Sequence, residues 1–149
     1  MPKLKSKRLE PVNKLAEKKE QEAASEFGAC MSQVQAMENQ VRKLYQYRED
    51  YNAQFNQASS SGLDSARLQD YLMFINNINH SIDKIFAQLN KKKLECDSKK
   101  ILWLEKHQQV KIYAKVKQKY LADELIIQNK NEQKQTDESS LAFYTRNKR

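Results

Sequence analysis

The side chains with the greatest chemical capacity are two histidines, His80 and His107, and two cysteines, Cys30 and Cys96. Neither histidine belongs to a set of ligands at the spacing that a zinc site requires. No carboxylate pair in a pocket and no glycine-rich phosphate loop accompanies them, so the sequence supplies no catalytic constellation. We therefore expect solvated histidines, a protein that is not an enzyme, and neither a metal nor a cofactor.

The composition favours helices as the elements that position all side chains. Only two glycines and two prolines occur among 149 residues, against average usages of about 7% and 5%, and strands with tight turns need both types. Seven Tyr, five Phe and one Trp argue against a disordered chain. No transmembrane run and no signal peptide is visible, so we expect a cytoplasmic chain with reduced cysteines.

One cluster of turn residues divides the chain, the segment 59–65 of sequence SSSGLDS. We predict a helix over about 12–58, a turn at about 59–63 and a second helix over about 64–140. Together they form a single coiled-coil domain, 1–149, with frayed basic termini.

Apolar residues recur in steps of three and four on both sides of this turn. Eight of nine such positions from Phe27 to Phe55 are apolar or aromatic, and so are thirteen of eighteen from Leu68 to Ile127. A sustained repeat of about 3.5 residues is typical of a left-handed coiled coil. The fold class predicted is all-α, an antiparallel coiled-coil hairpin of two long helices with an overhanging C-terminal helix.

Folding about the turn predicts a register for the seam. Cys30 then faces Lys92, about one layer from Cys96, so we do not expect a disulfide. Arg48 is expected to lay its stem along Ile75 with its head in water. The register pairs Phe55 with Leu68, Tyr51 with Tyr71, Leu44 with Ile78, Val41 with Ile82, Met37 with Ile85, and places Trp103 near Glu20.

The second helix is expected to outrun the first beyond about Tyr113. Its apolar stripe continues there, and such a stripe is an interaction surface, an oligomer seam or a frayed end. The apolar members are Tyr120, Leu121, Leu125 and Ile127, and the polar residues Gln128, Gln133, Asp137 and Glu138 follow them.

A lysine-rich stretch extends from Lys84 to Lys119, with eleven lysines against three acidic residues. It is a solvated face, a surface for an acidic protein, or a strip for nucleic acid. The alternative function that this stretch supports is a generic coiled-coil adaptor that binds nucleic acid or an acidic partner.

Several stretches together resemble the FliJ family, the coiled-coil protein of the flagellar type III export apparatus. The likeness rests on LYQYREDY at 44–51, YLMFINNI at 71–78, Trp103 in the second helix, and NEQKQTDE at 131–138. The order and spacing of these stretches and the total length fit the family.

The resemblance implies a non-enzymatic rod similar to the stalk subunit of rotary ATPases. Its partners would be the flagellar export ATPase, the export-gate membrane protein and export chaperones, with no nucleic acid, and flagellum assembly would require it. Its place would be cytoplasmic, peripheral on the inner membrane at the flagellar base.

Two sets of binding residues follow. Tyr47 and Phe74 flank the seam rather than fill it, and exposed aromatic residues favour binding. The family's export-gate patch falls on Gln40, Leu44, Tyr47, Tyr51, Phe74, Ile78, Ser81 and Ile85. Docking into the ATPase ring is expected at Tyr120, Leu121, Leu125, Ile127, Gln133, Asp137 and Glu138.

Overall fold

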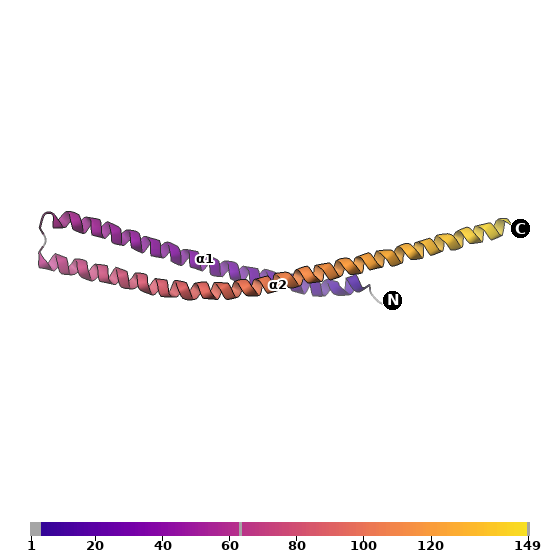
Figure 1. Ribbon diagram of the computed structural model, residues 1–149, viewed down its shortest axis with the longest axis horizontal. Coiled ribbons are helices and arrows are strands. Elements are labelled where there is room, and N and C mark those ends of the chain that lie inside the picture. The colour runs from indigo at the N-terminus through magenta and orange to yellow at the C-terminus, as the bar shows by residue number, and fades with distance from the viewer. Residues whose placement is uncertain (1–3, 63, 149) are drawn as a thin grey trace. The chain divides into compact units, whose positions relative to one another are not determined.

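The computed structural model describes residues 4–62 and 64–148. Two helices make up this part of the chain, α1 at Lys5–Ser59 and α2 at Ser65–Asn147 (Figure 1). Within the described ranges there is no strand. The predicted fold class, an all-α hairpin of two long helices, is therefore confirmed. Leu63, the last residue of the expected turn, lies outside the described residues.

Local capping interactions end α1 and start α2 at the turn. The hydroxyl groups of the serines at 59–61 donate to backbone carbonyl groups three residues earlier. Gly62 has φ of 87°, a left-handed conformation that only glycine adopts readily. Asp64 Oδ1 accepts the backbone N–H of Arg67 at 2.9 Å, the usual role of an N-cap carboxylate. The residues that predicted the turn therefore also build it.

The helices are longer than the predicted ranges. α1 begins at Lys5 rather than at about 12, and α2 continues to Asn147 rather than to about 140. Pro11 consequently lies inside α1 instead of in its first turn. Since proline has no N–H, the carbonyl of Lys7 loses its usual partner, whereas the carbonyl of Leu4 accepts the N–H of Arg8 at 3.1 Å.

The chain divides into two compact units, which are described separately below. Unit 1 comprises 1–22 and 104–149, and unit 2 comprises Ala23–Trp103. Each unit contains a stretch of α1 and a stretch of α2. The expectation of a single coiled-coil domain stays a prediction.

Unit 2 holds most of the buried apolar residues. Cys30, Val34, Leu89 and Cys96 form a buried cluster, and Met37 packs against it. Val41, Ile78 and Ile82 are also buried, as their seam positions predict. Burial of a large aliphatic side chain contributes about 1.5–3 kcal/mol, so this seam is the main source of stability in unit 2.

The observed register of unit 2 differs from the predicted one by about three residues. Phe55 stacks on Tyr71 at 3.6 Å between ring centroids, and its expected partner Leu68 is exposed. Trp103 stacks on Phe27, with 6.2 Å between the ring centroids. The heptad pattern allowed this error because most positions three or four residues apart near the turn are apolar, so either register pairs apolar with apolar there.

The expectation that the two cysteines of unit 2 do not pair is wrong for the same reason. Cys30 and Cys96 lie directly opposite each other, with 5.6 Å between their Cα atoms, and form a disulfide. Arg48 is half-buried, and its Nη1 donates to Oδ1 of Asn79 at 2.7 Å. The guanidinium also lies 4.9 Å from the ring centroid of Tyr45.

Unit 1 has a much thinner interior. Ala16 and Ser6 are the residues buried among those described in this unit, and all described residues from 125 onward are exposed. Glu124, opposite the start of α1, is the last half-buried residue of α2. The unpartnered part of α2 therefore begins after Glu124, not near Tyr113, because α1 starts earlier than expected.

Candidate functional site: two protein-binding surfaces

A run of stacked rings follows the seam of unit 2 near the turn. We call Tyr47, Tyr51 and Phe55 of α1 with Tyr71 and Phe74 of α2 the aromatic edge. Phe74 lies 4.0 Å from Tyr51 and 6.0 Å from Tyr47, between ring centroids. Tyr51 stacks on Tyr71 at 5.7 Å, the one predicted layer that a ring contact reproduces.

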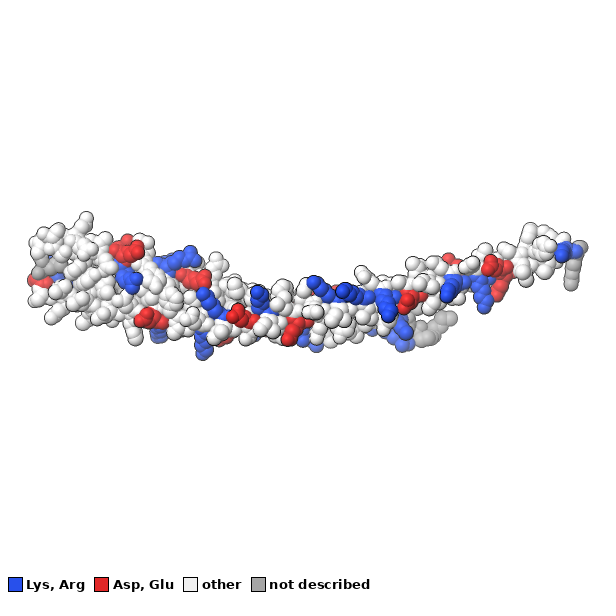
Figure 2. Space-filling view, viewed as in Figure 1, with Lys and Arg blue, Asp and Glu red and all other residues white. Residues whose placement is uncertain are grey.

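A hydrogen bond between α1 and α2 holds the aromatic edge, and one ring of the edge stays largely exposed to solvent. The Tyr71 hydroxyl donates to Oδ1 of Asn52 on α1. Tyr47 is 60% exposed although it belongs to the ring cluster. On the face drawn in Figure 2, the surface around the turn carries few charges. An exposed tyrosine supported by packed rings is well suited to anchor a protein partner.

The predicted export-gate residues do not all share this surface. Tyr47, Tyr51 and Phe74 are brought into contact, and Gln40 and Ser81 are exposed. Leu44 and Ile85 are half-buried. Ile78 is buried in the seam and offers no surface to a partner.

Two exposed apolar residues near the turn escaped the sequence analysis. Leu72 and Met73 lie on α2 directly before Phe74, and both are exposed. The signal that could have found them is an apolar residue outside the repeat of three and four, which also singled out Tyr47 and Phe74. They enlarge the apolar surface that flanks the aromatic edge.

A carboxylate of α2 caps the start of α1 in unit 1. Glu124 accepts the backbone N–H of Ser6 at 3.1 Å and the Ser6 hydroxyl at 2.7 Å, one on each oxygen. The first N–H groups of a helix have no partner within it, so this carboxylate replaces a local cap. Lys5 Nζ lies 5.7 Å from the ring centroid of Tyr120. We call this arrangement the Glu124 cap.

Two concavities lie beside the Glu124 cap, both within unit 1. One of about 580 Å³ is lined by Leu4, Lys5, Tyr120, Asp123, Glu124, Ile126 and Ile127. The other, also about 580 Å³, is lined by Leu4, Leu121, Glu124, Leu125, Ile127, Gln128, Asn131, Glu132 and Gln135. Apolar side chains in a polar surround are the composition of a docking face.

The predicted ATPase-docking residues fall into two groups. Tyr120, Leu121, Leu125 and Ile127 line these concavities, and Leu125 and Ile127 are 57% and 58% exposed. Gln133, Asp137 and Glu138 are exposed and line neither concavity. Sequence analysis missed Leu4, because the first helix was expected to begin after it, and the exposed Leu141, Phe143 and Tyr144.

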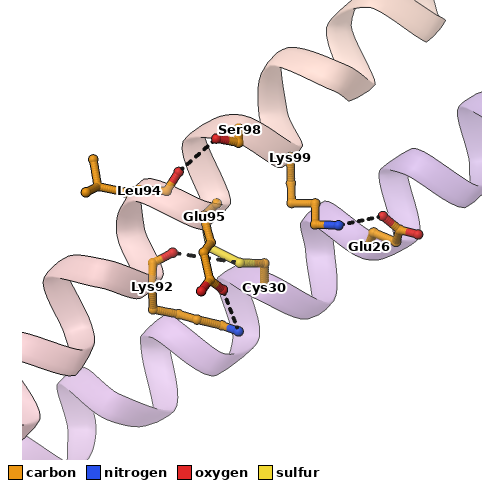
Figure 3. A network of polar contacts seen from close by, with 8 residues as sticks. Glu26, Cys30, Lys92, Leu94, Glu95, Ser98 and Lys99 are labelled. Atoms are coloured by element: carbon orange, nitrogen blue, oxygen red, sulfur yellow. Dashed lines mark hydrogen bonds and ion pairs between the residues drawn. A yellow bond between two sulfur atoms is a disulfide. The ribbon is translucent and has the colours of Figure 1, made fainter.

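One of the two histidines and several lysines of the lysine-rich stretch also have polar partners. His80 is exposed, as predicted, but Nδ1 of His107 lies 2.5 Å from Oε1 of Glu20 within unit 1. Among the described residues no group of three metal-ligating side chains occurs. In unit 2, Lys99 reaches Glu26 at 2.9 Å across the helices, and Lys92 pairs with the nearby Glu95 (Figure 3).

Lys93 adds a third ion pair, with Glu38 at 3.5 Å. These lysines are therefore partly neutralised within the chain.

Over the part of the chain that the structure describes, neither helix is apolar enough over sufficient length to cross a membrane.

Comparison with known proteins identifies the class of protein. The family model described as flagellar FliJ protein matches residues 5–149, and the chain belongs to the FliJ family. Curated relatives from Salmonella typhi and Escherichia coli strain K12, both described as flagellar FliJ protein, are each 28% identical over 130 residues. Each alignment covers 87% of this chain and 88% of the relative. No solved structure gives a significant match.

Membership of this family makes the chain a component of flagellar protein export. The resemblance drawn from the tyrosine-rich stretches and the C-terminal NEQKQTDE segment is confirmed by a match that includes all of them.

Proposed function

We propose that this chain is a non-enzymatic link between the flagellar export ATPase and the export gate in the membrane. Unit 1 docks on the ATPase ring and favours its assembled state, which raises nucleotide turnover. Unit 2 contacts the export-gate protein through the aromatic edge, and export chaperones bind the same chain. The site of action is the cytoplasmic face of the inner membrane at the flagellar base.

The observation that carries this proposal is that each unit exposes its own apolar surface. Unit 2 presents Tyr47 with Leu72 and Met73, and the ring of Phe74 packs against Tyr47 in a tilted arrangement. Unit 1 presents Leu125 and Ile127 beside the Glu124 cap. A protein that binds two different partners needs two such surfaces, and contiguous exposed apolar groups mark interaction sites.

ATPase turnover tests the role of unit 1. A variant with Leu125→Ser and Ile127→Ser should lose most stimulation of the purified export ATPase, since both side chains are exposed and the fold does not depend on them. The matched control is Leu94→Ser with Ile101→Ser, two exposed apolar residues of α2 in unit 2. Equal stimulation by the two variants would contradict the docking assignment.

Binding to the soluble part of the export gate tests the role of unit 2. Tyr47→Ala should weaken the affinity by about tenfold or more, as expected for loss of an aromatic anchor. Tyr144→Ala, which removes an equally exposed ring in unit 1, should leave the affinity unchanged. An unchanged affinity for Tyr47→Ala would exclude this ring from the gate surface.

A further inference from the structure

The disulfide of unit 2 joins the two helices within the buried core. Cys30 on α1 and Cys96 on α2 are 66 residues apart in sequence. Their Cα atoms are 5.6 Å apart, a separation that a disulfide spans without backbone movement. Both residues belong to the buried cluster that contains Val34 and Leu89. The bond therefore connects α1 to α2 at a packed layer, not at a flexible end.

Large apolar residues lie mainly on one side of this layer. Toward the turn, Val34, Met37 and Leu89 pack together. On the other side, the buried position of α1 is Ala23, and the ion pair of Lys99 with Glu26 crosses the helices (Figure 3). The Phe27–Trp103 ring pair supplies the apolar contact there. The covalent bond therefore lies at the boundary where large apolar side chains give way to smaller and polar ones.

The apolar pattern does not by itself select one register. In the observed register Phe55 stacks on Tyr71, and a shift of about three residues would place Leu68 opposite Phe55, again apolar on apolar. The two cysteines do distinguish the registers, because the shifted one places Lys92 opposite Cys30. Only the observed register brings the two sulfur atoms together.

We propose that Cys30 and Cys96 form a reversible redox clamp that fixes the register of α1 against α2 in unit 2. In oxidation by a small-molecule disulfide, one cysteine thiolate attacks it and forms a mixed disulfide, releasing a first small thiol. The second cysteine then displaces the other small thiol and closes the Cys30–Cys96 bond. Two electrons pass from the cysteine sulfurs to the oxidant, and the two protons leave on the released thiols.

The clamp responds slowly to the surrounding thiols. Cys30 and Cys96 are only 6% and 3% exposed, and exchange requires access of a thiolate to the sulfur atoms. Opening and closing of the bond therefore follow local separation of the helices. In a reducing cytosol the resting form is the dithiol, and oxidation locks the register.

The clamp regulates the proposed gate surface, and this part rests on the proposed function. A change of register moves Phe74 along Tyr47 and Tyr51, whose ring contacts build the aromatic edge. The locked form presents the aromatic edge as one fixed surface. The reduced form exchanges between registers and presents it for only part of the time, which lowers the apparent affinity for the gate.

Thermal unfolding of the full chain tests the clamp without any partner. Treatment with oxidised glutathione should remove two hydrogens by mass and raise Tm by roughly 10 °C over the chain kept in reduced glutathione, the shift expected for closing a long loop. The matched control, Cys30→Ser with Cys96→Ser, should melt at the same temperature under both conditions. Equal Tm values for oxidised and reduced chain would overturn the clamp.

Two reporter pairs test the register in that Cys30→Ser, Cys96→Ser background. Met37→Cys with Leu89→Cys reports the observed register, and Met37→Cys with Ile85→Cys reports the shifted one. The proposal expects both pairs to cross-link, whereas cross-linking of the first pair alone overturns the exchange of registers.

Gate binding is then compared for the oxidised and reduced parent chain. Tighter binding when oxidised supports the regulation, equal binding overturns it, and no binding in either state contradicts the proposed function instead.

Discussion

Unit 2 and unit 1 use the same two helices in different ways. Unit 2 buries Val34, Ile82 and Leu89 and ties its helices together by a disulfide. Unit 1 buries Ala16 and Ser6 among its described residues and holds the start of α1 by the Glu124 cap. Apolar packing stabilises one unit, and a polar anchor holds the other.

The thin interior of unit 1 is accompanied by a run of three consecutive exposed apolar residues. In unit 1 the side chains of Leu125, Ile126 and Ile127 lie on α2 and all three are exposed. At about 25 cal/mol per Å² of apolar surface removed from water, their burial by a partner would contribute substantially to binding. Unit 2 thus has a packed seam within the chain, whereas the apolar side chains of α2 after Glu124 in unit 1 stay exposed.

The largest expected effect comes from a charge in the core of unit 2. Ile82 is 4% exposed, so Ile82→Asp places an unpaired carboxylate in an apolar seam and should cost roughly 3–5 kcal/mol of unfolding free energy. Ser81→Asp adds the same charge one residue earlier, at an exposed position. It should lower the unfolding free energy by less than about 0.5 kcal/mol. Circular dichroism melts measure both, and similar Tm values would show that unit 2 has no essential core.

A smaller effect separates packing from binding within the aromatic edge. Phe74→Ala should cost about 2 kcal/mol, because the ring packs on Tyr51 and Tyr47 and is half-buried. Tyr47→Ala should cost less than about 0.5 kcal/mol, since that ring is mostly exposed. Denaturant titration of both variants compares them, and the reverse order would refute this arrangement of the rings.

Loss of the Glu124 cap should destabilise unit 1 by about 1 kcal/mol, the usual cost of removing a helix cap. Glu124→Ala removes both acceptors of Ser6, so amide exchange over 5–12 should accelerate. Asp123→Ala removes a neighbouring carboxylate and is the control. Exchange rates equal to those of the parent would mean that the carboxylate does not hold α1.

The smallest effect stabilises the chain. A Cβ added at Gly28 meets no atom within 4 Å, so Gly28→Ala should raise the unfolding free energy by less than about 1 kcal/mol through better helix propensity. Gly62→Ala should lower it by a similar amount, because the residue adopts a positive φ. Melting curves of the two variants should shift in opposite directions, and shifts of the same sign would contradict the assignment of the turn.

The sequence predicted the helices and the turn because their signals are local. Gly62 and Asp64 supply the turn conformation and the cap, and the apolar repeat places Ile78 and Ile82 in the seam. The register was missed because an apolar repeat is satisfied at several offsets. The disulfide depends on that register, so the error of about three residues excluded Cys96 as the partner of Cys30.

The binding surfaces were predicted only in part. Tyr47 and Leu125 are exposed as their positions suggested. Ile78 is buried in the seam instead of exposed to a partner protein. The sequence pattern marks an apolar position but does not reveal whether α1 or another protein covers it. The Glu124 cap joins residues 118 positions apart. No local pattern links Ser6 to a glutamate so far along the chain.

Hydrogen exchange of the full chain, alone and with the export ATPase, tests most directly whether unit 2 is the packed unit and whether the exposed part of unit 1 docks on the ATPase. In the free chain, amides over 78–96 should exchange slowly and those over 125–148 rapidly, because the first segment lies in the packed seam and the second is exposed. Addition of the ATPase should slow exchange over 120–138 and leave 78–96 unchanged. Slow exchange over 125–148 in the free chain, or no protection there with the ATPase, would contradict the account.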